Sequence, residues 1–211
     1  MKRKHIFLIV TVIICILITG LLHTSILKPT EEIQTELSDK LLRFHVIANS
    51  DRQEDQALKM KVKEAVLDEM RPYLSETETR EEAEKRILEH LNSIIDTANK
   101  TLLENESNQE VHAQIETSYF PTKTYGDFTF PPGNYRALRI TLGEAEGKNW
   151  WCVMYPPLCF VDASYGTVPE GSKNQLKGLL TDETYDSIQD TEKPIKIGFR
   201  LFPFLNNLFS K

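Results

Sequence analysis

The stretch RFHVIANSDRQEDQALKMKVKEAV, residues 43–66, contains the change from strand to helix on which the fold depends. Apolar and polar side chains alternate up to Ala48, which is typical of a strand buried on one face and partly covered on the other. A polar Asn-Ser-Asp sequence interrupts this pattern, and apolar residues recur at helical spacing from Leu58 onward. His45 and several carboxylates lie near the junction, so it is either a reactive site or a helix start.

Helix capping accounts for the polar residues of this junction without any reaction. Ser50 or Asp51 can accept hydrogen bonds from the amides of the first helical turn, and Glu54 can reach back as the partner of a capping box. Glu54 and Asp55 also face the positive end of the helix dipole. A cap of this kind stabilises a helix by about 1 kcal/mol. We therefore favour the structural interpretation over a catalytic one.

The chain around the junction predicts two helices. The first covers residues 53–71 and ends at Pro72. The second begins at one of two capping-box sequences, residues 75–78 or 79–82, and carries one apolar stripe from Ala83 to Leu102.

Short alternating segments, separated by turn signals, predict strands in the second half of the chain. Together with residues 41–48 they are residues 111–120, 125–130, 135–142 and 149–155. We expect an α+β fold, in which an antiparallel sheet of about five strands is backed by two helices. The polar residues 162–194 predict a loop and a short helix, and the apolar residues 196–208 are expected to return to the sheet or dock on it.

The N-terminus has the pattern of an export segment. Three basic residues precede an apolar run of 17 residues from Ile6 to Leu22, and no acidic residue occurs before Glu31. We interpret residues 1–27 as a signal peptide or membrane anchor whose basic end stays in the cytoplasm. Residues 28–40 are expected to be a linker, either a tether or a short first helix, and residues 41–211 a single extracytoplasmic domain.

The charge of the remaining chain excludes some partners. The whole sequence has a net charge of −6, and residues 1–30 contain four of its 25 basic residues and none of its 31 acidic ones. Residues 31–211 therefore carry a net charge of −10. Because such a domain is repelled by phosphate backbones, nucleic-acid binding is disfavoured.

Familiar catalytic and metal-binding patterns are missing from the sequence. It contains neither G-x-S-x-G nor H-E-x-x-H. Among the five histidines only His45 and His112 could meet across a sheet, and no third ligand is evident from spacing. Cys152 and Cys159 supply too few ligands for zinc, and they either form a disulfide outside the cytoplasm or remain two buried thiols. We predict no catalytic residue, metal or cofactor.

Two pairs of residues in the predicted strands suggest an interaction surface. Arg136 and Arg139 project from opposite faces of one strand, and Trp150 and Trp151 from opposite faces of the next. One tryptophan is expected in the core. The other is either covered as well or an exposed anchor of the kind that contributes strongly to protein–protein binding.

Two long segments carry a resemblance to a known family. Residues Arg43–Val66, quoted above, and FPPGNYRALRITLGEAEGKNWWCVMYPPLCF, Phe130–Phe160, resemble stage II sporulation protein R of endospore-forming bacteria. The resemblance runs from about Leu41 to the early 160s and includes the N-terminal export segment.

The resemblance implies a signalling role without catalysis. Proteins of this family are made in the forespore and exported into the space between the two septal membranes. There they activate a membrane-embedded aspartic protease of the mother cell, which removes the pro-sequence from the precursor of the early mother-cell sigma factor. This chain would then contact the membrane through its N-terminal segment and the protease through its domain.

If the helix start and the adjacent strands lie side by side, seven residues are candidates for the surface that binds the protease. They are His45, Asn49, Asp51, Arg136, Arg139, Trp150 and Trp151. One competing hypothesis is an extracytoplasmic hydrolase acting on cell-wall material, with Asp51 or Asp55 as acid or base and His45 nearby. Another is a purely structural protein of the septum.

Overall fold

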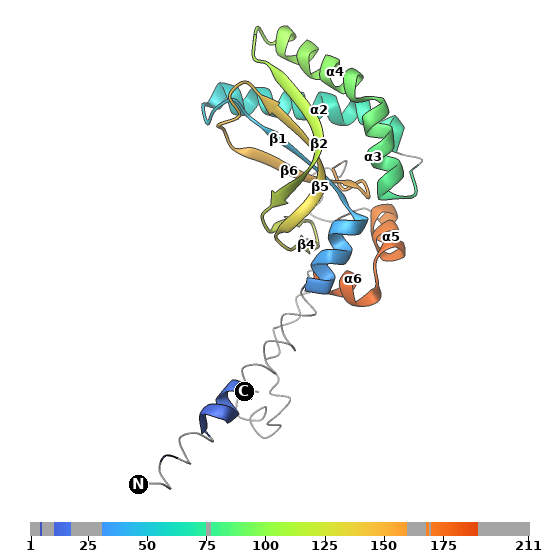
Figure 1. Cartoon of the computed structure of the whole chain (residues 1–211). Coiled ribbons are helices and arrows are strands. Elements are labelled where there is room, and N and C mark those ends of the chain that lie inside the picture. Colours follow the sequence, from blue (N-terminus) through green and yellow to red (C-terminus); the bar gives the residue numbers. More distant parts are fainter. Residues whose placement is uncertain are drawn as a thin grey trace.

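The computed structural model describes residues 5, 11–17, 31–74, 77–159, 168 and 170–189 (Figure 1). Residues 31–40 form a helix, which is one of the two alternatives expected for the segment before the domain. The elements that follow are β1 (Leu42–Ile47), α2 (Gln53–Leu74), α3 (Arg80–Glu89), α4 (Leu91–Glu104), β2 (Val111–Phe120), β3 (Lys123–Tyr125), β4 (Phe128–Phe130), β5 (Gly133–Leu142), β6 (Asn149–Tyr155), α5 (Glu170–Leu179) and α6 (Asp182–Ile188). The fold is α+β, as predicted.

Most of the predicted export or anchor segment lies outside the described residues. Residues 5 and 11–17 are helical. No helix in the described part of the chain is long and apolar enough to cross a membrane.

The prediction of a wholly antiparallel sheet of about five strands is wrong. The main sheet has four strands in the order β2-β5-β1-β6, while β3 and β4 pair with each other in a separate two-stranded sheet. β1 runs parallel to β5 and antiparallel to β6, and β2 runs antiparallel to β5. The strand next to β1 on one side is β5, and β2 pairs with the far edge of β5. The prediction failed because the alternation of apolar and polar residues does not show which strand will be the neighbour or in which direction it runs.

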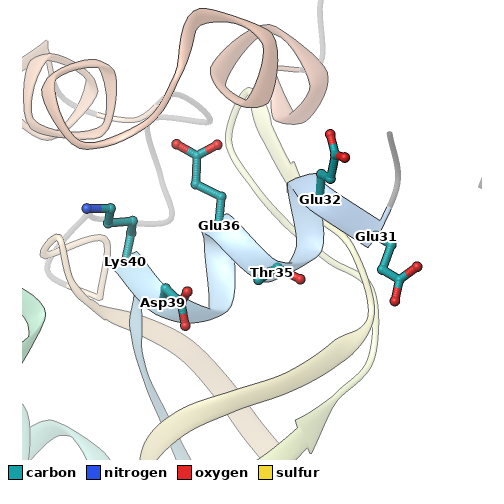
Figure 2. A pocket seen from close by; sticks show the side chains of 6 residues that line it. All are labelled: Glu31, Glu32, Thr35, Glu36, Asp39 and Lys40. Atoms are coloured by element: carbon teal, nitrogen blue, oxygen red, sulfur yellow. The ribbon is translucent and has the colours of Figure 1, made fainter. Parts of the chain in front are cut away.

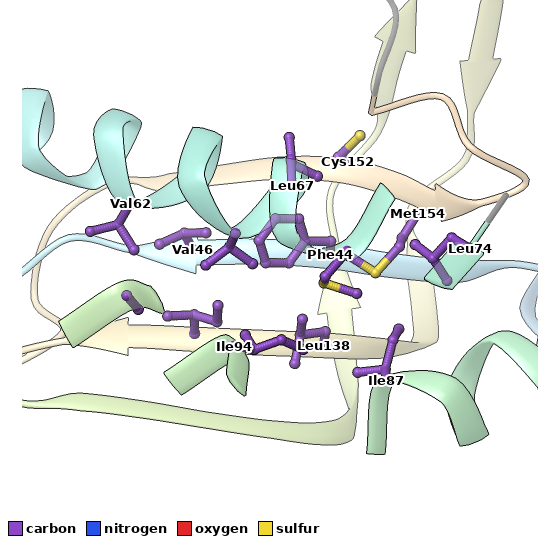
Figure 3. Packing of buried hydrophobic residues seen from close by; sticks show 14 of the residues in the cluster. Phe44, Val46, Val62, Leu67, Leu74, Ile87, Ile94, Leu138, Cys152 and Met154 are labelled. Carbon is purple, nitrogen blue, oxygen red and sulfur yellow. The ribbon is translucent and has the colours of Figure 1, made fainter. Parts of the chain in front are cut away.

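One face of the sheet packs against α2, α3 and α4 (Figures 1 and 3). Phe44 in β1 is fully buried at the centre of this layer, opposite Leu138 in β5 and Cys152 in β6. The helices contribute buried side chains such as Val62 and Ile94. We call this layer the first core cluster.

The other face of β1 is also buried, since Arg43 is fully buried and His45 is 4% exposed. A second core cluster covers the part of that face near the start of β1. Its buried residues include Leu37 from the helix over 31–40, Phe130 from β4, Leu176 from α5 and Ile188 from α6. Figure 1 shows these elements gathered at one end of the sheet.

Two helix boundaries differ from the predictions. α2 ends at Leu74, so Pro72 lies in its last turn. The predicted second helix is two helices, α3 and α4, separated at His90. Its apolar stripe continued across the break because Ile87 and Ile94 enter the same core cluster, and periodicity therefore did not reveal the interruption.

The capping box at residues 79–82 is confirmed as the start of α3, since Thr79 Oγ1 accepts a hydrogen bond from the Glu82 amide at 3.1 Å.

The described part of 162–194 contains two helices, α5 and α6, where one was expected. The predicted return of residues 196–208 to the sheet lies outside the described residues.

Phe44→Ala tests the importance of the first core cluster. Phe44 is fully buried, and its ring meets that of Trp150 edge-on at 5.6 Å between centroids. Loss of the ring should lower the free energy of unfolding by about 3–5 kcal/mol, measured by denaturant titration. Leu103→Ala is the control because Leu103 is 67% exposed, and it should change stability by less than about 0.5 kcal/mol. Equal losses in the two variants would contradict this packing.

Candidate functional site

Asp55 is the centre of a polar junction between β1 and α2. Its carboxylate accepts hydrogen bonds from Asn49 Nδ2 at 3.0 Å, Gln109 Nε2 at 2.7 Å, the Arg52 guanidinium at 3.3 Å and the Ser50 hydroxyl. The hydrogen bond from Ser50, aided by the other donors, lowers the pKa of Asp55 to about 2 although burial opposes the shift. The side chain is therefore a buried anion whose partners are already supplied by the protein.

Asn49 and Asp51 join this junction to the loop between β5 and β6. Asn49 Oδ1 accepts from the Glu144 amide at 2.9 Å, and Asp51 Oδ1 accepts from the Lys148 amide at 2.7 Å. Gly143 makes the close approach possible, because it has a φ of +54° and a Cβ at this position would lie 2.2 Å from Asn49 Oδ1.

The polar residues of the junction bind one another and the neighbouring loops, but not in the roles that the capping interpretation gave them. Ser50 Oγ accepts from the Arg52 amide at 3.2 Å, which is a hydrogen bond within the turn before α2 and not a cap of its first turn. Asp51 instead holds the β5–β6 loop, and Asp55 occupies the centre where Glu54 was expected to contribute. The sequence pattern did not reveal Gln109, which reaches Asp55 from the loop between α4 and β2.

This geometry fits the hydrolase hypothesis poorly. With a pKa of about 2, Asp55 holds no proton near neutral pH and cannot serve as a general acid there. Its carboxylate is also occupied by the donors of the junction. Asp51 is bound to the Lys148 amide. His45 is bound elsewhere, with Nδ1 lying 3.2 Å from Asn149 Oδ1.

His45 is a buried, neutral side chain. It is 4% exposed, its ring stacks on Trp151 with 4.9 Å between centroids, and Phe120 meets it edge-on at 5.2 Å. Burial lowers the pKa of His45 to about 4, so the ring is uncharged at neutral pH. Its Nε2 is buried without a hydrogen-bond partner in the described part of the molecule.

Arg43 is a central residue that the sequence analysis missed. It is fully buried, and its Nε donates to the Cys152 carbonyl at 2.9 Å. Its guanidinium lies over the rings of Phe120 at 4.4 Å and Tyr135 at 4.9 Å, and Nη2 donates to the Tyr125 hydroxyl at 3.2 Å. The alternation of β1 placed Arg43 on the same face as His45, but nothing local to the strand indicated aromatic partners from β2, β3, β4 and β5.

The two arginines and the two tryptophans project from opposite faces, as predicted. Arg136 forms an ion pair with Glu84 of α3 on the helix side, and Trp150 packs against Phe44 in the first core cluster. On the other side Arg139 lies 3.6 Å from Glu116 of β2. The seven candidate residues therefore do not share one surface, since they divide between the two faces and the polar junction.

Three of the seven candidates form a row across one face of the sheet. His45 is paired with Arg139 on one side and with Trp151 on the other, so their side chains point the same way. Trp151 is half-buried, while the side chains of Arg139 and Glu116 are 33% and 30% exposed. We call Trp151, Arg139, Glu116 and the underlying His45 the Trp151 face.

His45 and His112 do not meet. β5 lies between their strands, and His112 is an exposed side chain 3.5 Å from Glu110. Among the described residues no group of three His, Cys, Asp or Glu side chains could hold a metal ion. Cys152 and Cys159 are joined in a disulfide with 5.6 Å between their Cα atoms.

An acidic hollow of about 610 Å³ follows the helix over residues 31–40 (Figure 2). The side chain of Glu36 points from this helix toward α5 and α6. Its carboxylate accepts hydrogen bonds from the Thr181 amide at 2.7 Å and from the Thr181 hydroxyl at 2.8 Å. Glu36 therefore binds the start of α6, which is a structural role.

Asp55→Asn tests the polar junction through its pH dependence. Because the pKa of Asp55 is lower in the folded chain than its usual value of 3.8, ionised Asp55 stabilises the fold above about pH 4. That contribution, about 2.5 kcal/mol, should be lost as the pH falls from about 4 to 2. Asp55→Asn should lose a similar amount at pH 7 and show a flatter pH dependence between pH 4 and 2, measured by thermal or denaturant unfolding.

Asp68→Asn serves as the control for this measurement, because Asp68 forms an exposed ion pair with Arg71. It should change stability by less than about 0.5 kcal/mol. A variant of Asp55 with wild-type stability at pH 7 would contradict the role assigned to the junction.

Comparison with known proteins identifies the family. The family model described as Stage II sporulation protein R (spore_II_R) matches residues 38–165. Stage II sporulation protein R of Bacillus subtilis (strain 168) is 34% identical over 221 residues, covering 95% of this chain and 99% of the relative. The relative's name describes a sporulation protein and no enzymatic activity, and no solved structure matches the chain. The chain belongs to the stage II sporulation protein R family, which supports a role in sporulation.

Proposed function

We propose that this protein is an exported signal that activates a membrane-embedded aspartic protease of the mother cell by binding to it. In this proposal the chain is made in the forespore and reaches the septal intermembrane space through its N-terminal segment, as a secreted or anchored protein. The activated protease then processes the precursor of the early mother-cell sigma factor. Membership of the family supports the sporulation role, and the family resemblance supports the finer steps.

The main support for a binding function is the protonation and burial of Asp55 and His45, near the β1–α2 junction. Asp55 is ionised and enclosed by donors, and His45 is neutral and covered by Trp151. Near neutral pH neither side chain holds an acidic proton to donate, and both are already bound to other groups of the domain. The state of these two residues supports a ligand that acts through contacts and disfavours the hydrolase hypothesis.

The Trp151 face is our candidate for the surface that contacts the protease. Tryptophan and arginine are the residues most enriched where truncation costs the most binding energy. Trp151 is held in one orientation by His45 and by Phe120, whose ring centroid lies 4.8 Å away. Because this side chain is already ordered in the free protein, binding would cost little side-chain entropy.

Activation requires preferential binding to the active state of the protease. A ligand shifts a conformational equilibrium only by the ratio of its affinities for the two states. A binding contribution of about 2 kcal/mol from one side chain corresponds to roughly a 30-fold change in that ratio, if the contact forms only in the active state. Substitution of a single central residue should therefore be enough to reduce processing.

The direct test is reconstitution in a host that does not sporulate, with this chain, the candidate protease and the sigma-factor precursor produced together. We expect cleavage of the precursor only when all three are present. Trp151→Ala should reduce the cleavage at least tenfold, and Arg139→Ala should reduce it less because its pair with Glu116 is partly exposed.

Tyr119→Ala is the matched control, because Tyr119 is a 62% exposed aromatic residue on the opposite face of the sheet. It should leave cleavage unchanged, and circular dichroism should show that all variants are folded. Full cleavage with folded Trp151→Ala would eliminate the Trp151 face as the binding surface. Cleavage without this chain would eliminate the proposed function itself.

A further inference from the structure

The disulfide between Cys152 and Cys159 holds a short loop against the outer edge of β6. The two cysteines are seven positions apart. The carbonyl of Val153 accepts hydrogen bonds from the amides of Leu158 at 3.2 Å and Cys159 at 3.1 Å. Among the described residues β6 is the last strand of the sheet, and no described strand pairs with its outer edge. The loop therefore covers part of an edge that would otherwise be free to pair with another chain.

The same loop connects several parts of the second face. Leu158 is 3% exposed and belongs to the second core cluster. The Pro157 carbonyl accepts from the Ser172 hydroxyl of α5 at 3.3 Å. At the other end of the loop, the Cys152 carbonyl accepts from Arg43 Nε at 2.9 Å. Opening the loop would therefore weaken the docking of α5 and the surroundings of the buried guanidinium together.

The loop also begins next to the Trp151 face. Trp151 immediately precedes Cys152 in β6, and its ring packs against the second core cluster. Carbonyls of alternate residues in a strand point the same way, so Trp151 and Val153 present their carbonyls to the same edge. The position of the loop thus affects both the packing beneath Trp151 and the accessibility of the backbone beside it.

We propose that the Cys152–Cys159 pair is a redox latch, which keeps the chain inactive while its thiols are reduced and activates it when the disulfide forms after export. This inference rests on the proposed function. Thiols stay reduced in the cytoplasm, whereas disulfides persist outside it. The chain would therefore acquire its active surface only in the compartment where the receptor is met.

Closure of the latch needs an oxidant that itself carries a disulfide, such as a thiol–disulfide oxidoreductase. One cysteine thiolate of the pair attacks that disulfide, forming a mixed disulfide and expelling one thiolate of the oxidant. The second cysteine, after losing its proton, then attacks the mixed disulfide. The Cys152–Cys159 bond forms, and the oxidant leaves with both of its sulfurs reduced, having taken up two electrons.

The loop is short, but the covalent bond changes its equilibrium substantially. The entropy of closing a loop of this length corresponds to a shift on the order of 50-fold in the ratio of closed to open forms. Without the bond, the loop is held by the two amides on Val153, the contact of Ser172 and the burial of Leu158. We expect the reduced loop to open and to release α5.

The test uses the full-length chain in detergent with Cys15→Ser, so that only the pair can titrate, equilibrated in reduced or oxidised glutathione. Alkylation followed by mass spectrometry counts the free thiols in each sample. Limited proteolysis should cut the reduced chain within residues 152–159 and 170–180 at least tenfold faster than the oxidised chain. In the reconstituted processing assay the reduced chain should support about tenfold less precursor cleavage.

The double variant Cys152→Ala/Cys159→Ala should behave like the reduced chain in both buffers, while Cys15→Ser alone should behave like the wild type. Equal proteolysis of the reduced and oxidised chains would overturn the latch. Equal and measurable precursor cleavage by both forms would overturn it as well. If neither form supports cleavage while proteolysis still depends on redox state, the proposed function fails and the structural latch stands.

Discussion

The burial of β1 on both sides and both faces is the constraint on which the rest of the structure depends. The strand lies between β5 and β6, and each of its six residues is buried. One face is apolar and packs under α2, α3 and α4. The other face carries Arg43 and His45, whose polar groups must be satisfied inside the protein because water cannot reach them.

The protein meets part of this need with rings and carbonyls, while Arg43 Nη1 and His45 Nε2 have no hydrogen-bond partner among the described residues. In the described part of the chain the charge of Arg43 is met by the Cys152 carbonyl, by a tyrosine hydroxyl and by the faces of aromatic rings. Cation–π contacts of this kind gain strength when they are desolvated. The hairpin β3–β4 therefore covers the buried guanidinium of Arg43 and also binds it, because the Tyr125 hydroxyl accepts one of its hydrogen bonds.

The end of β1 that leads into α2 is fixed by hydrogen bonds of the polar junction. Asp55 draws together the β1–α2 turn and the loop before β2, while Asn49 and Asp51 bind the loop before β6. Between these two ends lies the Trp151 face. Its position on strands that are fixed at both ends explains how a small domain can present a rigid surface.

The sequence predicted those elements whose turn residues, caps and apolar spacing lie within the element itself. The β1–α2 junction, the cap at Thr79 and the strands near 111–120 and 149–155 follow from turn residues and periodicity. The parallel pairing of β1 with β5 could not be predicted, because the alternation of apolar and polar residues shows which face of a strand is buried but not which strand lies beside it. The partners of Asp55 and Arg43 come from distant segments, so their roles required the fold.

The central claim is that the protein acts by binding stoichiometrically to its receptor and not by chemistry of its own. The most direct measurement is a titration of the oxidised chain into a fixed amount of the candidate protease and its precursor substrate. Precursor cleavage should rise in proportion to the added chain and level off when the protease is saturated. Full cleavage with only a trace of the chain, continuing after the chain is removed, would contradict the account.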